Sequence, residues 1–206
     1  MREGLEVVDL EGQALGALAP RERILKTASD LFYRLSIHTV GIDRIIAESG
    51  VAKMTFYKHF PSKANLVAAY LRHKNAVWLG MLVTAAEGGG LSPLERVLAI
   101  FEALEVSFQA PSFRGCPFVK GLAEFGPDAD APDVKAAIAA YFKDLHDFVA
   151  SLIAPLALDE PERAVLQILS LIQGAIVMAQ STGDPAIAAA NRDAARRLLQ
   201  DGANRA

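Results

Sequence analysis

The side chains best suited to chemistry lie between residues 53 and 59, in the run Lys-Met-Thr-Phe-Tyr-Lys-His. If this run is helical, Phe56 and Phe60 share one face and point inward, because they are four residues apart. The opposite face then carries cations, a hydroxyl, a phenol and an imidazole, from Lys53, Thr55, Tyr57, Lys58 and His59. Such groups contact DNA phosphates and base edges. The competing interpretation is an ordinary solvated helix face.

The segment before this helix decides between the two interpretations. Ile42, Ile45 and Ile46 lie on one helical face, and Gly50 follows them. Glycine adopts the positive φ of a tight turn without steric cost. Residues 39–60 therefore read as a helix-turn-helix, which favours contact with nucleic acid.

Residues 50–60, GVAKMTFYKHF, and residues 61–66, PSKANL, resemble the DNA-binding segment of the TetR-type (TetR/AcrR) transcriptional regulators. The resemblance is close over about residues 20–80, and beyond them only helical layout and length match. Two residues depart from the family pattern: Ser36 stands where glycine usually follows the first helix, and Ile46 is bulkier than the small residue of many members. The resemblance implies a homodimeric, ligand-responsive regulator of transcription.

The exposed helical positions and the match to the family motif together predict two sets of DNA contacts. We expect the residues that face the major groove to be Lys53, Met54, Thr55 and Lys58. We expect the residues that mainly hold phosphates to be Thr39, Arg44, Tyr57, His59 and Lys63. Ser62 should cap the helix that starts at Lys63, so that free N–H groups of this helix join the lysine on a phosphate.

The charge distribution separates the same region from the rest of the chain. The 206 residues carry a net charge of −3. Residues 20–75 hold ten basic and four acidic side chains, whereas residues 76–206 hold ten basic and sixteen acidic ones. A basic unit joined to an acidic remainder indicates an anionic partner that binds at one end, here double-stranded DNA.

The apolar content indicates a permanent partner. Hydrophobic residues make up 52% of the chain, whose mean hydropathy is +0.24, and excess apolar surface usually marks an interface. The longest apolar run, residues 164–179, is interrupted by Gln167, Ser170 and Gln173, so we expect it to be too short and too polar to span a membrane. The N-terminus lacks a signal-peptide pattern, and the single cysteine fits a reducing compartment, so we expect a cytoplasmic protein.

Helix signals along the chain predict an all-α fold of about nine helices. Residues 1–19 show no periodicity and carry three glycines, and we expect a flexible N-terminal arm there. Residues 20–75 should form a three-helix, helix-turn-helix DNA-binding domain that begins at Pro20. Residues 76–206 should form a helical effector-binding and dimerisation domain, with the boundary inside a long fourth helix.

Capping residues predict where the helices of the second domain begin. Ser92-Pro93-Leu94-Glu95 is a capping box with proline at the first helical position. Further helices are expected from Cys116 or Pro117 to Phe125, from about Pro132 to Ile153, from about Pro161 to Thr182, and after Pro185.

The last two predicted helices should form the dimer interface. The helix near Pro161 is apolar on most sides and must be covered all round, and the next one is rich in alanine, which allows close approach. Two copies of this pair would make a four-helix bundle around a two-fold axis. The predicted interface residues are Leu169, Ile172, Gln173, Ile176, Ala195, Leu198 and Leu199.

The resemblance also implies an effector pocket among the fourth to eighth helices. The candidate lining residues are Trp78, Phe101, Phe108, Cys116, Phe118, Tyr141 and Phe142. Cys116 has two interpretations. A small buried hydrophobe is the commonest role of a lone cysteine and is favoured. A reactive thiol is the alternative, because Pro117 would place Cys116 at a helix N-cap with Arg114 nearby, where positive potential favours the thiolate.

The sequence offers little for catalysis, and we expect no cofactor, no metal and no enzyme activity. Asp128, Asp130 and Asp133 fit a helix cap and a solvated loop better than a metal site. His146 and Asp147 could be a base and its orienting acid, but adjacent helical residues diverge by about 100°, so we expect them not to face each other.

The sequence therefore predicts a sequence-specific DNA-binding transcriptional regulator. A repressor released from a palindromic operator by a small-molecule effector is the favoured form. The alternatives are an activator of the same architecture, and an all-α enzyme or carrier whose helix-turn-helix is only structural. Specific, salt-sensitive binding to operator DNA would separate the last alternative from the other two.

Overall fold

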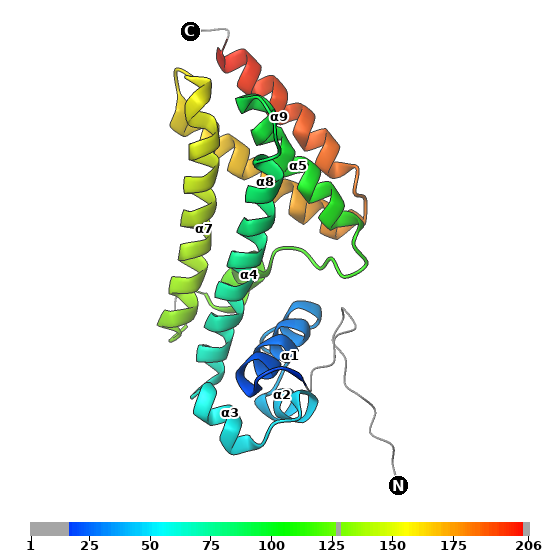
Figure 1. Cartoon of the computed structure of the whole chain (residues 1–206), viewed down its shortest axis with the longest axis vertical. Helices are drawn as coiled ribbons and strands as arrows, with labels where there is room; N and C mark the ends of the chain where they lie inside the picture. Colours follow the sequence, from blue (N-terminus) through cyan, green and yellow to red (C-terminus); the bar gives the residue numbers. More distant parts are fainter. Residues whose placement is uncertain (1–16, 127–128, 204–206) are drawn as a thin grey trace. The chain divides into compact units, whose positions relative to one another are not determined.

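The computed structural model describes residues 17–126 and 129–203, and all regular structure within these ranges is helical. The expected arm at residues 1–16 lies outside the described residues. The helices are α1 Pro20–Arg34, α2 Ile42–Ser49, α3 Lys53–His59, α4 Lys63–Ala86, α5 Pro93–Gln109, α6 Pro117–Glu124, α7 Pro132–Ile153, α8 Pro161–Thr182 and α9 Ile187–Ala203. Figure 1 labels each of them except α6. A short 3-10 turn, η2 Ala154–Leu156, follows α7. The all-α prediction is confirmed.

The described chain divides into two compact units. The first combines the described part of Met1–Lys74 with Pro117–Ile138, and the second combines Asn75–Cys116 with the described part of Ala139–Ala206. One division between the units falls within α4, between Lys74 and Asn75. However, α6 and the first part of α7 group with the helix-turn-helix. The first unit is therefore discontinuous in sequence.

In the first unit, α1 supplies the apolar surface that α2 and α3 contact. Ile24 and Phe32 of α1 are buried, as are Ile45 of α2 and Phe56 of α3. Full burial of a side chain of this size stabilises the fold by about 1.5–3 kcal/mol. Helices as short as α2 and α3 are marginal alone, so this packing holds them in place.

Gly50 makes the turn between α2 and α3, as the sequence predicted. Its backbone is left-handed, with φ 64° and ψ 28°. No heavy atom lies within 4 Å of the position that a Cβ atom would take. The turn therefore needs glycine for its backbone conformation and not for space.

The second unit is built on α5, α8 and α9, which pack against one another. The predicted capping box opens α5: the Glu95 N–H donates to Ser92 Oγ at 3.3 Å, and the Ser92 N–H donates to Glu95 Oε2 at 2.8 Å. Gly183, with φ 71°, ends α8 where the sequence predicted. These local signals fix the helix ends before tertiary packing is considered.

The α8 helix is strongly apolar, although much of its surface is not buried within the protomer. An 18-residue window of this helix has a mean hydropathy of 1.6, so length and composition alone would allow it to cross a membrane. A core helix of a soluble protein meets the same criteria, so this helix does not indicate a membrane protein. Packing buries 39% of the window. The exposed α8 face, defined here as Leu166, Ser170, Gly174 and Val177, lies on one side because its members are three or four residues apart.

A pair of glycine substitutions tests the turn between α2 and α3. Gly50→Ala should lower the free energy of unfolding by about 1–2 kcal/mol, because an L side chain disfavours the left-handed conformation. Gly80→Ala is the matched control inside α4, where no atom lies within 4 Å of the Cβ position, and it should raise the same quantity by about 0.5–1 kcal/mol. Urea unfolding measures both, and equal shifts in one direction would contradict the turn.

Candidate nucleic-acid interface

The exposed side of α3 carries the residues that the sequence assigned to the major groove. Met54 is 82% exposed, and the side chain of Lys53 is 67% exposed. Lys58 is also exposed, and Thr55 is half-buried. Phe56 lies on the opposite side and is 0% exposed. An apolar side chain as open as Met54 contributes little to the fold, so it is available for contact with another molecule.

The residues expected to hold phosphates are distributed over the helices and turns around α3. Tyr57 is exposed and packs edge-on against Phe56, with ring centroids 5.3 Å apart. His59 is half-buried at the end of α3, and Thr39 is exposed before α2. Arg44 lies on α2, with a side chain 49% exposed. The structure thus places all four in the first unit with at least part of each side chain accessible.

Two acidic side chains lie among these cations. Arg44 Nε donates to Glu48 Oε1 at 2.7 Å, and Lys53 Nζ lies 3.7 Å from Asp43 Oδ1. All four side chains are exposed to water, where an ion pair contributes little stability. A phosphate can therefore compete with either carboxylate for its cation.

Lys63 is the first residue of α4, as predicted. Ser62 caps this helix, because the Asn65 N–H donates to Ser62 Oγ at 3.1 Å. Burial lowers the pKa of the Lys63 ammonium, and the Glu124 carboxylate opposes that shift. The free N–H groups of the first turn still favour an anion at this end of α4.

The α6 helix contacts the loop before α2, which the sequence did not reveal. The Glu124 carboxylate accepts hydrogen bonds from the Ile37 N–H at 3.2 Å, the His38 N–H at 2.7 Å and the Ser36 hydroxyl at 3.3 Å. His38 Nε2 lies 2.8 Å from the Glu124 carbonyl oxygen. One signal was present in the sequence, namely serine at position 36 where the family usually has glycine.

A buried polar cluster surrounds the Tyr141 hydroxyl in the second unit. Gln173 Nε2 donates to this hydroxyl at 3.1 Å, and the Cys116 thiol and the Trp78 indole also interact with it. Burial, followed by the effect of Cys116, raises the pKa of Tyr141, which keeps the phenol neutral. Gln173 Oε1 and Trp78 Nε1 have no well-formed hydrogen-bond partner in the described chain.

The structure brings some of the predicted pocket residues together and separates others. Phe142 joins the Tyr141 cluster, with ring centroids 5.0 Å apart. Phe101 and Phe108 are buried on α5, where Phe108 packs against Phe113. Phe118 is buried in the first unit. Gln173, which the sequence placed at the dimer interface, is instead part of the Tyr141 cluster.

An open surface groove of about 270 Å³ lies where the start of α8 meets the end of α9. Its lining includes Asp159, Glu160, Arg163 and Gln167. Arg163 donates to Glu160 across one turn, at 3.0 Å. None of the predicted pocket residues lines this charged groove, so we do not assign it to an effector.

Four of the seven predicted interface residues are buried within the protomer. Ile172 and Ala195 are 0% exposed, Leu199 is 2% exposed and Ile176 is 3% exposed. Their side chains pack into the core of the second unit, which corrects the expectation that they face a second copy. The remaining predicted residues, Leu169, Gln173 and Leu198, are half-buried.

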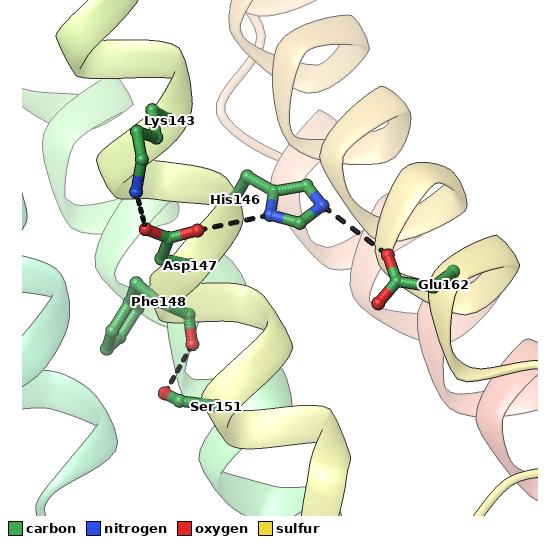
Figure 2. A network of polar contacts seen from close by, with 6 residues as sticks. All are labelled: Lys143, His146, Asp147, Phe148, Ser151 and Glu162. Atoms are coloured by element: carbon green, nitrogen blue, oxygen red, sulfur yellow. Dashed lines mark hydrogen bonds and ion pairs between the residues drawn. The ribbon is translucent and has the colours of Figure 1, made fainter.

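Figure 2 shows His146 between two carboxylates of the second unit. Its Nδ1 lies 3.4 Å from Asp147 Oδ1, and its Nε2 lies 3.7 Å from Glu162 Oε2. The expectation that His146 and Asp147 do not face each other is wrong, because side chains that diverge at Cβ can still meet at their ends. A hydrogen bond from Lys143, and a weaker one from His146, lower the pKa of Asp147. The cluster links α7 to α8, and the Ser151 hydroxyl beside it donates to a backbone carbonyl.

Two family models match the chain. The model described as "Bacterial regulatory proteins, tetR family" matches residues 24–70. The model described as "Tetracyclin repressor-like, C-terminal domain" matches residues 93–195. The first match contains the helix-turn-helix. The second contains the exposed α8 face and the Tyr141 cluster apart from Trp78.

Relatives of known sequence and structure agree with these matches. A crystal structure of a TetR-family transcriptional regulator from Streptomyces coelicolor is 32% identical with a TM-score of 0.81, and the match covers 89% of this chain and 96% of that one. An HTH-type transcriptional regulator of Mycobacterium tuberculosis is 26% identical over 80% of this chain and 86% of its own length. Another, from Lactococcus lactis, is 24% identical over 84% of this chain and 89% of its own length.

The burial of Cys116 leads to a prediction about its reactivity. Cys116 is 6% exposed and interacts with the Tyr141 hydroxyl. Iodoacetamide should therefore modify it only as fast as the surrounding helices open, because a buried thiol is shielded from the reagent. The rate measured in denaturant serves as the control for an accessible thiol. Rapid alkylation of the folded protein between pH 5 and 9 would instead support the reactive-thiol interpretation.

Proposed function

Since the chain belongs to the TetR family of helix-turn-helix transcriptional regulators, we propose that it acts as a homodimeric repressor that a small-molecule effector releases from a palindromic operator. Regulators of this family bind DNA and are not enzymes. The predictions of the family and of the absence of enzyme activity are therefore confirmed. The repressor, the dimer, the operator symmetry and the effector are the parts that we propose.

The exposure of Met54 and Lys53 on one side of α3 is the main observation that supports operator binding. Met54 and Lys53 project from the first turn of this helix, opposite the buried Phe56. A lysine reads guanine O6 and N7 in the major groove, and an apolar side chain contacts the thymine methyl group. Recognition helices of this motif enter the groove with their N-terminal residues. Tyr57 and Lys63 would then hold the phosphates on either side.

The exposed α8 face supports dimerisation. Leu166 is 60% exposed and Val177 is 47% exposed, and Met178 beside them is 49% exposed. A second copy related by a two-fold axis would cover this surface and form a four-helix bundle from two α8–α9 pairs. Two recognition helices would then reach successive major grooves, roughly 34–36 Å apart. Such a dimer requires a palindromic operator.

The Tyr141 cluster supports a small-molecule site. Gln173 Oε1 can accept a hydrogen bond and has no partner in the described chain. Trp78 Nε1 can donate one, either to the neighbouring Tyr141 hydroxyl or to a ligand. A ligand with one acceptor and one donor would pair with both, while Phe142 supplies apolar contact. Leaving a buried polar group unpaired costs about 1–3 kcal/mol, so this ligand would also stabilise the fold. Gln173 lies on α8, and a ligand bound there would therefore act on the helix that carries the dimer face.

A pair of lysine substitutions tests the DNA-binding surface. Lys53→Ala should weaken binding to the selected operator by about 1–3 kcal/mol and should relax sequence preference, because it removes a base contact. Lys63→Ala should weaken all sequences about equally and should reduce the salt slope by about 1, because it removes a phosphate contact. Binding to operator and to random DNA at several salt concentrations measures both effects.

The same experiment contains its own controls. If Lys53→Ala lowers affinity for operator and random DNA by the same factor, its base-reading role is wrong. If the wild-type protein binds no sequence more tightly than random DNA, the proposal that it recognises an operator is wrong. The sign of regulation is read from a promoter that carries the operator: loss of the protein should raise expression, and a fall would identify an activator.

The dimer is tested by one substitution on the exposed α8 face and one in the core. Leu166→Glu should give a folded monomer, because the side chain is 60% exposed in the protomer. Ile172→Glu should unfold the protomer, because it buries an unpaired charge at a position that is 0% exposed. Sedimentation velocity at micromolar concentration and circular dichroism separate the two results. A dimeric Leu166→Glu protein would place the interface elsewhere.

A further inference from the structure

The end of α1 lacks the left-handed glycine that follows the last turn of many helices. The backbone carbonyls of a last helical turn have no hydrogen-bond donors within the helix. When a left-handed glycine follows the helix, backbone N–H groups beyond the helix donate to these carbonyls. Here Leu35 ends α1 with φ −105° and ψ −71°. Residues 34–41 are all described by the structure, and none of them has a positive φ. Something else must hold the chain as it turns from α1 toward α2.

The α6 helix supplies the missing partners. Lys120 Nζ donates to the Tyr33 carbonyl oxygen in the last turn of α1, at 3.3 Å, and lies 5.3 Å from the centroid of the Tyr33 ring. Glu124 lies one turn later on α6 and accepts from the N–H groups of Ile37 and His38. The cation therefore meets backbone carbonyl oxygen and the anion meets backbone N–H, which are the favourable combinations of charge.

A chain of hydrogen bonds continues from Glu124 to the predicted DNA surface. The Ser36 hydroxyl donates to Glu124 Oε2 and accepts from the Thr39 N–H at 3.4 Å. The Thr39 hydroxyl donates to the Ser36 carbonyl oxygen at 3.2 Å. On the other side of the loop, the His38 ring packs against Phe125, with centroids 5.1 Å apart. Serine at position 36 therefore has a specific partner on α6.

We propose that Glu124 is a positioning residue for DNA binding, whose carboxylate holds residues 36–38 in the conformation from which Thr39 and α2 reach the DNA backbone. Lys120 supports the same junction from the α1 side. The inference rests on the proposed function, since it assumes that the helix-turn-helix binds an operator. The inference also predicts a change in DNA affinity of the opposite sign to the one expected from charge alone. Removing a negative charge from a DNA-binding protein should strengthen its attraction to phosphates, whereas loss of the positioning contact should weaken binding.

The experiment uses the full-length protein and the Glu124→Gln substitution, which keeps the size of the side chain and removes its charge. Operator affinity should fall about tenfold, because apparent affinity scales with the fraction of molecules in the binding-competent conformation. Amide exchange at Ile37 and His38 should become faster while α3 keeps its protection. Glu87→Gln is the matched control: this glutamate is exposed near the end of the long α4 helix, and its substitution makes the same change in charge. Its operator affinity should equal or exceed that of the wild type.

The outcomes separate this inference from the function on which it rests. Wild-type protein without specific DNA binding would overturn both. Specific wild-type binding, with a folded Glu124→Gln protein that binds as tightly as Glu87→Gln, would overturn the positioning role alone. If Glu124→Gln fails to fold, Ser36→Ala replaces it, because it removes only the hydroxyl between Glu124 and Thr39. Ser36→Ala should lower operator affinity about threefold by the same loss of the competent conformation, and unchanged affinity would overturn the inference.

Discussion

The burial of one face of α3 against α1 is the interaction on which the rest of the molecule depends. A helix of seven residues does not persist in water by its own propensity. Phe56 therefore does two things when it enters the core: it makes α3 helical, and it turns Met54 and Lys53 outward. The stability of the first unit and the orientation of the exposed side of α3 have the same cause. A change that loosens the core therefore also moves Met54 and Lys53, the side chains that we propose contact DNA bases.

The sequence predicted the parts of the fold that depend on neighbouring residues. The capping box at Ser92 and Glu95, the left-handed turn at Gly50 and the bounds of α7 all follow from residues close together in the chain, and the structure has each of them. The exposed face of α3 could be predicted for the same reason, because Phe56 and Phe60 fix which side points inward. Short-range rules sufficed wherever one helix side was clearly apolar and the other was not.

The errors fell where a side chain's direction depends on distant parts of the chain. A helix as uniformly apolar as α8 has no periodic signal to show which side faces the core, so Ile172 was assigned to the dimer interface although it is buried within the protomer. Gln173 reaches Tyr141, 32 residues earlier, and Glu124 reaches its loop across 86 to 88 residues. Contacts of that separation leave no pattern in a single sequence, apart from an unusual residue such as Ser36.

The discontinuity of the first unit limits how far this DNA-binding module can be treated as an exchangeable part. Phe118 and Val134 complete its core from residues 117–138, and Glu124 comes from the same segment. Consider a hybrid regulator made by joining the first 75 residues of one family member to the remainder of another. Its loop before α2 and its α6 helix would come from different proteins and would not have evolved to contact each other. The loop of one protein would contact the side chains at positions 120 and 124 of the other. The design of such hybrids should therefore match these residues to the loop, in addition to choosing the operator sequence and the effector.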